Sequence, residues 1–139
     1  MEITANALQT VQANQNVIFT DTAVCGNNSI IHREGSGLTT LRGLTNQCRA
    51  RFRIFFSGNI AIPTGGAVGP ISLAITTDGE VVDSTTMIVT PSAVEQFFNV
   101  AGAIYLNVPC GCCTKISVTN TSTEAIEVQN ANLIIERVA

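Results

Sequence analysis

Charge is scarce in this sequence. Charged residues make up only 12% of its 139 residues, about half the usual share of roughly 25%. Hydrophobic residues reach 45%, and the mean hydropathy is +0.32. A composition this apolar is not that of a disordered chain, and it supplies more apolar side chains than one small core needs. We therefore expect part of the surplus to lie at an interface between subunits.

Long hydrophobic runs and a basic N-terminus are also missing. No stretch approaches the roughly 18 consecutive apolar residues that a membrane-spanning helix requires, which predicts no membrane association. Residues 1–6 (MEITAN) lack the basic and apolar regions of a secretory signal. A location outside the cell would therefore require another route: assembly inside a mother cell, lysis or a dedicated exporter. The net charge of −3 argues against nucleic acid as the main partner.

The sequence is rich in β-branched residues, Gly and Asn, and no stretch has a helical pattern. Alternating segments are separated by turn residues such as Asp78-Gly79, a typical hairpin turn. A first strand is expected within residues 7–22, centred on residues 17–19. The other expected strands are 29–33, 38–42, 48–60, 71–77, 81–90, 96–108, 115–119 and 126–138. Some eight to ten strands at this spacing predict an all-β, antiparallel jelly-roll sandwich formed by residues 16–139. Residues 1–15 are polar, and we expect them to form an N-terminal arm outside the core.

Two kinds of strand can be distinguished. Residues 48–56 alternate, with an apolar face and a face that carries three arginines, as in a strand with one side in water. Residues 97–106 and 133–135 are instead apolar on both faces. Such strands predict contact with a second copy of the chain on the side away from the core. The candidate interface residues are Phe97, Phe98, Tyr105, Leu133 and Ile135.

Residues 130–139 (NANLIIERVA) and residues 67–92, with their Asp78-Gly79 hairpin and Thr90-Pro91-Ser92 turn, carry a family resemblance. They resemble the C-terminal domain of the collagen-like glycoprotein of the bacterial exosporium, one of the complement/tumour-necrosis-factor-like jelly rolls. The resemblance covers roughly residues 16–139. It implies a compact homotrimer that forms a head on a spore surface, attached to an anchoring protein of a larger assembly. Because the sequence has no Gly-X-Y stalk, the resemblance also suits a phage capsid decoration or head-fibre protein on a virion.

Five cysteines are present, an odd number that leaves at least one thiol unpaired within the chain or paired with another chain. Zinc binding is one interpretation of the Cys-Gly-Cys-Cys cluster, with another cysteine or His32 completing the ligand set, and a redox site is a second. However, zinc sites favour two separated ligand pairs, and the sequence has one tight cluster. We therefore expect disulfides, with inert or reduced thiols as the alternative, and no metal and no cofactor. The disulfide candidates are Cys25, Cys48, Cys110, Cys112 and Cys113.

Arg49, Arg51 and Arg53 project from one strand face and hold three of the seven basic residues. Guanidinium groups in this arrangement suit an anion, a glycan or a receptor. The alternative is a solvated face whose arginines pair across strands with acids such as Glu95 or Glu136. His32 is the only histidine, and no nucleophile or orienting acid accompanies it in a known catalytic pattern. We therefore expect the protein not to be an enzyme.

Overall fold

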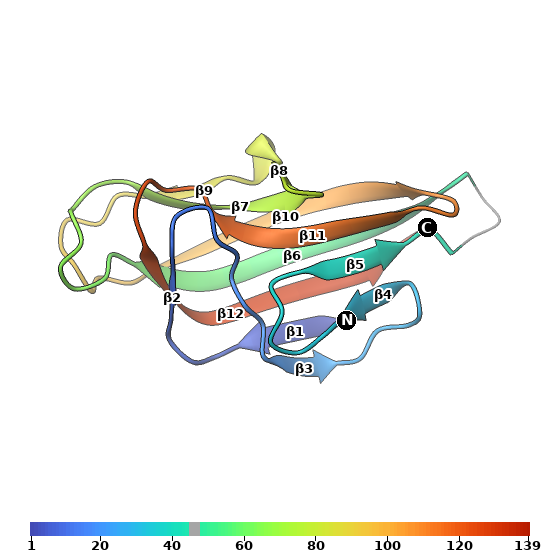
Figure 1. The fold of residues 1–139 in the computed structure, drawn as a ribbon, viewed down its shortest axis with the longest axis horizontal. Coiled ribbons are helices and arrows are strands. Elements are labelled where there is room, and N and C mark those ends of the chain that lie inside the picture. Colours follow the sequence, from blue (N-terminus) through green and yellow to red (C-terminus); the bar gives the residue numbers. More distant parts are fainter. Residues whose placement is uncertain (45–47) are drawn as a thin grey trace.

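The computed structural model describes residues 1–44 and 48–139 and has two antiparallel sheets (Figure 1). In sheet A the strand order is β10-β6-β12-β1-β3, with β2 also paired to β12; in sheet B it is β4-β5-β11-β7-β8, with β9 paired to β7. In the described residues no helix is long and apolar enough to cross a membrane. The strands are β1 (Glu2–Ala5), β2 (Gln9–Val11), β3 (Asp21–Val24), β4 (Ile30–His32), β5 (Thr39–Arg42), β6 (Arg49–Ala61), β7 (Ile71–Thr77), β8 (Glu80–Val81), β9 (Met87–Val89), β10 (Phe98–Pro109), β11 (Cys113–Asn120) and β12 (Ile126–Arg137).

The core lies between the two sheets, and strand β6 shows how the sequence directs side chains into it. Successive side chains of a strand point to opposite faces. Phe52, Ile54 and Phe56 accordingly have no exposed surface, whereas the three arginines of the opposite face are exposed. The ring of Phe56 meets that of Phe19 edge to face, with centroids 6.4 Å apart. The prediction that this strand has one apolar and one wet face is confirmed.

The hairpin predicted at Asp78-Gly79 is present between β7 and β8. Both residues have positive φ, 50° and 85°, the conformation that a two-residue type I′ turn requires. The return strand expected over residues 81–90 is, however, interrupted by a short 3-10 turn at Asp83–Thr85. The Thr85 hydroxyl donates to the Val82 carbonyl at 2.6 Å and accepts the Ile75 backbone N–H at 2.9 Å, which fixes the interruption.

The prediction of an N-terminal arm over residues 1–15 is wrong. β1 lies inside sheet A between β12 and β3, and β2 pairs with β12. The side chains of Ile3, Ala5 and Val11 belong to the core and are at most 3% exposed. Many of the neighbouring residues are polar because they occupy the outward positions of short strands, so average polarity concealed an alternating pattern.

The strand expected within residues 7–22, centred on residues 17–19, is also not present as predicted. Its two ends form β2 and β3, which lie in different parts of sheet A. The segment between them connects the sheets through isolated bridges from Asn16 to Thr119 and from Phe19 to Ser36. Val17 and Phe19 are nevertheless buried, at 0% and 1% exposure.

Candidate functional site

The candidate site is the outward face of sheet A, the side away from the core. The β6–β10 ladder runs from Phe98 opposite Ile60 to Pro109 opposite Arg49. β12 pairs with the other edge of β6, and β1 and β3 follow. Because directly opposed residues point to the same face, this register determines which side chains share the outward surface.

One outward row crosses all five strands and is mostly apolar. Ala103 lies opposite Phe55, which lies opposite Ile134. Ile134 lies opposite Glu2, and Glu2 opposite Val24 at the far edge. Ala103 and Val24 are exposed, whereas Phe55 and Ile134 are half-buried. The Glu2 carboxylate accepts a 2.8 Å hydrogen bond from the Asn132 amide, so this acid is held by a neighbour within the face.

The predicted interface residues fall into two groups. Tyr105 lies on the outward face opposite Arg53 and is 67% exposed; Phe97 and Phe98 are partly exposed near the other end of β10. Leu133 and Ile135, in contrast, are core residues at 2% and 0% exposure, so their assignment to an interface is wrong. Strand alternation explains the error: the residue between them, Ile134, is the outward one.

The three arginines lie on the same outward face, at the end nearest the β10–β11 turn. Arg53 forms an ion pair with Glu136 on β12, with 3.3 Å between nitrogen and oxygen. Arg51 donates from Nε to the Asn107 amide oxygen at 3.4 Å. The predicted cross-strand pairing with Glu136 is therefore confirmed, and because both partners are exposed it is worth at most about 1 kcal/mol.

A shallow hollow of about 500 Å³ adjoins this row. Arg51, Tyr105 and Asn107 line it together with the C-terminal residues Val138 and Ala139. The backbone N–H of Arg51 donates to the Ala139 carbonyl oxygen at 3.2 Å, and that of Val138 donates to the Arg51 carbonyl at 2.9 Å. The end of the chain is thus fixed beside β6, which gives the hollow a defined wall that carries both an arginine and an aromatic ring.

All five cysteines are exposed, and no disulfide joins them among the described residues. Cys110, Cys112 and Cys113 lie at the β10–β11 turn, where Cys48 also lies; Cys25 follows β3 instead. The turn is at the same end of the sandwich as the C-terminus (Figure 1). Within residues 1–44 and 48–139, no group of three or more His, Cys, Asp or Glu side chains is placed to hold a metal ion.

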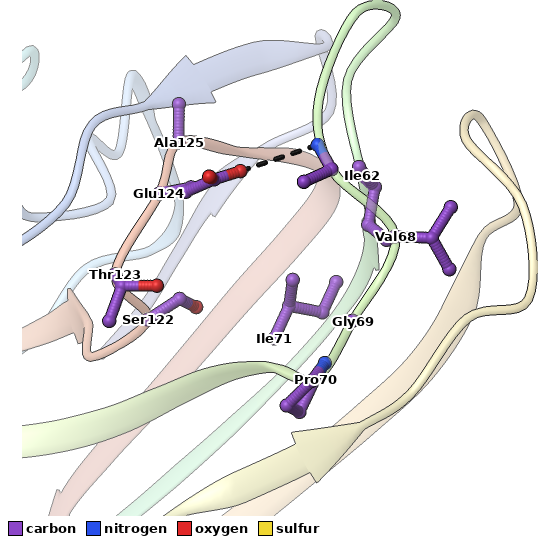
Figure 2. A pocket seen from close by; sticks show the side chains of 10 residues that line it. Ile62, Val68, Gly69, Pro70, Ile71, Ser122, Thr123, Glu124 and Ala125 are labelled. Atoms are coloured by element: carbon purple, nitrogen blue, oxygen red, sulfur yellow. Dashed lines mark hydrogen bonds between the residues drawn. The ribbon is translucent and has the colours of Figure 1, made fainter.

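A second hollow, of about 170 Å³, opens between the loop after β6 and the loop before β12 (Figure 2). Ile62, Val68 and Ile71 line one part of it, and hydroxyl-bearing residues line the other. The Glu124 carboxylate spans the two loops and accepts the Ala67 backbone N–H at 3.3 Å. The hollow is small, and its one acidic side chain, that of Glu124, is engaged in the hydrogen bond that joins the two loops.

Two carboxyl groups meet near this loop end. A side-chain hydrogen bond with Glu95 raises the pKa of Glu127, and burial and the charge of Glu95 add to the rise. The same bond from Glu127, together with Thr64, lowers the pKa of Glu95. The Thr64 backbone N–H and hydroxyl both donate to Glu95, at 2.9 and 2.8 Å. Glu95 is therefore engaged at this end of the molecule and is not a partner of the arginine row.

His32 has the environment of a structural residue. Its Nε2 lies 3.0 Å from the Ser36 carbonyl oxygen. Its ring meets that of Phe19 edge to face, with centroids 6.4 Å apart. These contacts hold the residue against the core and place it apart from the cysteine cluster.

Comparisons with known proteins support the fold. No family model matches the sequence, and no curated protein matches it. The structure is similar to the globular domain of the zebrafish complement 1qA protein, with a TM-score of 0.62 and 14% identity over 96% of this chain and 93% of that chain. It is also similar to murine APRIL, with a TM-score of 0.60 and 7% identity over 95% and 96% of the two chains. The chain therefore has the complement/tumour-necrosis-factor-like jelly-roll fold that the resemblance predicted.

Proposed function

We propose that this protein is a non-enzymatic structural building block that forms a homotrimer through the outward face of sheet A. The observation that carries the proposal is the mostly apolar row across that face, from Ala103 through Phe55 and Ile134 to Val24. Transfer of such a surface from water into an interface contributes about 25 cal/mol per Å² of apolar area. We take the number of chains in the assembly, three, from the trimeric association that the family resemblance implies.

A pair of arginine substitutions tests this proposal. Ala103→Arg places a charge in the apolar row, where side chains from neighbouring copies would have to bury it. Ile88→Arg is the matched control, because Ile88 is 64% exposed on β9 and belongs to sheet B. The proposal expects Ala103→Arg to dissociate the assembly and Ile88→Arg to leave it intact, measured by light scattering. Equal masses for the two variants would contradict the use of sheet A.

We place the trimer on the exterior of a spore or virion, held by an anchoring protein and assembled inside the cell. The resemblance of residues 67–92 and 130–139 to the exosporium head domain supports this location. Exposed cysteines are suited to the oxidising conditions outside a cell, where we expect at least one disulfide and no stoichiometric metal. Antibody labelling of intact, unpermeabilised particles tests the location. Label on the particle surface would support it, and label that appears only after disruption would contradict it.

A capsid decoration or head-fibre protein of a phage is the alternative with the same architecture. Antibody labelling of purified virions and of purified spores from the source organism separates the two settings. A spore protein would be detected on the spores alone, and a phage protein on the virions alone. In both, the sandwich is a surface building block whose loops and sheet faces are presented to the surroundings.

A second candidate function is binding of an anionic glycan or a receptor by the row Arg49, Arg51 and Arg53. The hollow lined by Arg51, Tyr105 and Asn107 favours it, because a guanidinium group beside an aromatic ring suits a sugar that carries an acid group. A screen of sulfated and sialylated glycans tests it. Arg51→Ala should abolish binding, and the control Arg33→Ala, outside sheet A, should not. Equal binding by both variants would refute this site.

A further inference from the structure

Gly43, the residue that follows β5, forms two backbone hydrogen bonds with the turn between β10 and β11, a contact that we call the clasp. The Gly43 backbone N–H donates to the Cys112 carbonyl at 3.0 Å, and the Gly111 N–H returns a bond to the Gly43 carbonyl at 3.2 Å. A Cβ atom on Gly43 would lie only 2.1 Å from the Pro109 carbonyl oxygen, so the approach requires glycine at this position. The clasp therefore holds the backbone of the turn close to the end of β5.

Cys48 and Cys110 lie opposite each other at this clasp. The β6–β10 ladder ends with Pro109 opposite Arg49, and one further step of the same antiparallel register pairs Cys110 with Cys48. The Cys110 backbone N–H donates to the Cys48 carbonyl at 3.0 Å, as this pairing requires. Directly opposed residues of an antiparallel pair have Cα atoms roughly 4.5–5.5 Å apart. That separation lies inside the range of about 4.4–6.8 Å that disulfides span.

The two side chains also share a face. Alternation places Cys48 on the same side of β6 as Ala50, and Cys110 on the same side of β10 as Val108. Ala50 and Val108 are opposite each other and have no exposed surface. The two cysteines are thus the next inward-facing pair beyond the end of the core, where both are exposed and accessible to an oxidant.

Cys113 and Cys25 are in less favourable positions to form a disulfide with Cys48. Cys113 lies opposite Arg42 on β5, in sheet B. Cys25 follows β3, and β3 and β10 form opposite edges of sheet A. The register of the ladder therefore favours Cys110 over Cys25 and Cys113 as the partner of Cys48.

We propose that Cys48 and Cys110 form an intrachain, cross-strand disulfide when the protein meets a low-molecular-weight disulfide such as oxidised glutathione. The thiolate of one cysteine attacks a sulfur of the oxidant, forms a mixed disulfide and releases one glutathione thiolate. The thiolate of the second cysteine then attacks the protein sulfur of that mixed disulfide and displaces the second glutathione. The two protein thiols lose two protons and two electrons, and the oxidant's sulfur–sulfur bond becomes two thiols. The crosslink fastens the entry of β6 to the end of β10 and does not depend on the oligomeric state.

A variant with Cys25, Cys112 and Cys113 replaced by Ser tests the pairing, because it retains only the proposed partners. After incubation with oxidised glutathione and denaturation, its two thiols should fall to none, and its mass on a non-reducing gel should remain that of one chain. The further replacement Cys48→Ser is the matched control and should prevent formation of the intrachain bond. Retention of both thiols, or a crosslink between two chains, would overturn the proposal.

The unsubstituted protein provides the second measurement. Tandem mass spectrometry of non-reduced chymotryptic peptides should join the peptide that contains Cys48 to Cys110. A bond from Cys48 to Cys112 or Cys113 would overturn the assignment, as would one zinc per chain in elemental analysis of the purified protein. Because these measurements report covalent bonds and metal content, they give the same answer whether or not the protein forms a trimer.

Discussion

The carboxyl groups of Glu95 and Glu127 shift each other's pKa in opposite directions: their interaction raises the pKa of Glu127 and lowers that of Glu95. Glu127 is only 6% exposed, and its Oε2 has no hydrogen-bond partner among the described residues. The interaction with Glu95, together with burial, disfavours ionisation of Glu127 and raises its pKa, whereas the pKa of Glu95 is lowered. This interaction connects the loop before β10 with strand β12.

The opposite pKa shifts of Glu95 and Glu127 predict that the free energy of unfolding depends on pH in two ways. The raised pKa of Glu127 contributes stability that is lost as pH rises through that pKa. The lowered pKa of Glu95 contributes stability that is lost as pH falls through that pKa. In Glu127→Gln the side chain at this position no longer ionises, so we expect the loss of stability with rising pH to diminish in denaturation curves measured across pH. Glu124→Gln is the control and should keep that loss; the same loss in Glu127→Gln would contradict the interaction between the two carboxyl groups.

Strand β1 should be essential for stability. Ile3 has no exposed surface and lies opposite Leu133 in sheet A. Ile3→Ala should lower the free energy of unfolding by about 2–5 kcal/mol, the cost of a cavity in a packed core. Leu8→Ala is the control, because Leu8 is 51% exposed and its truncation should cost less than about 1 kcal/mol. Similar small losses for both variants, measured by chemical denaturation, would mean that residues 1–15 do not belong to the sandwich.

The clasp at the cysteine end should depend on Gly43. Gly43→Ala brings a methyl group against the Pro109 carbonyl oxygen, so the two segments must separate. We expect a loss of about 1–3 kcal/mol, typical of overpacking, and slower formation of the Cys48–Cys110 bond in oxidised glutathione. Gly69→Ala is the matched control, since a Cβ atom there meets no other atom within 4 Å. Unchanged stability and oxidation rate in Gly43→Ala would contradict the clasp.

The sequence was most informative where strands are long and alternate regularly. The even-numbered apolar positions of β6 and the positive-φ turn at Asp78-Gly79 follow from local chemistry alone, and both were predicted. The interruption at Asp83–Thr85 was not, because it depends on a hydroxyl of Thr85 that bonds to a neighbouring strand. Strands as short as β1 and β2 carry too few alternating positions to be distinguished from a polar tail.

The candidate site was only partly predictable for a related reason. The arginine row was evident from alternation within one strand, and its partner Glu136 was among the candidates. Leu133 and Ile135 were assigned to the wrong face because residues 133–135 are all aliphatic, so the pattern alone could not determine which of them points outward. The pairing of Cys48 with Cys110 requires the register of two strands that are far apart in sequence, and only the fold supplies it.

The most direct test of the proposed function is the mass of the unsubstituted protein in solution. Multi-angle light scattering at micromolar concentration should give the mass of three chains of 14.6 kDa each, because the apolar row on sheet A is then covered by the neighbouring copies. Reducing conditions should give the same mass, since the contact is proposed to rest on the sheet face. A mass of one chain, or of two, would contradict the trimer.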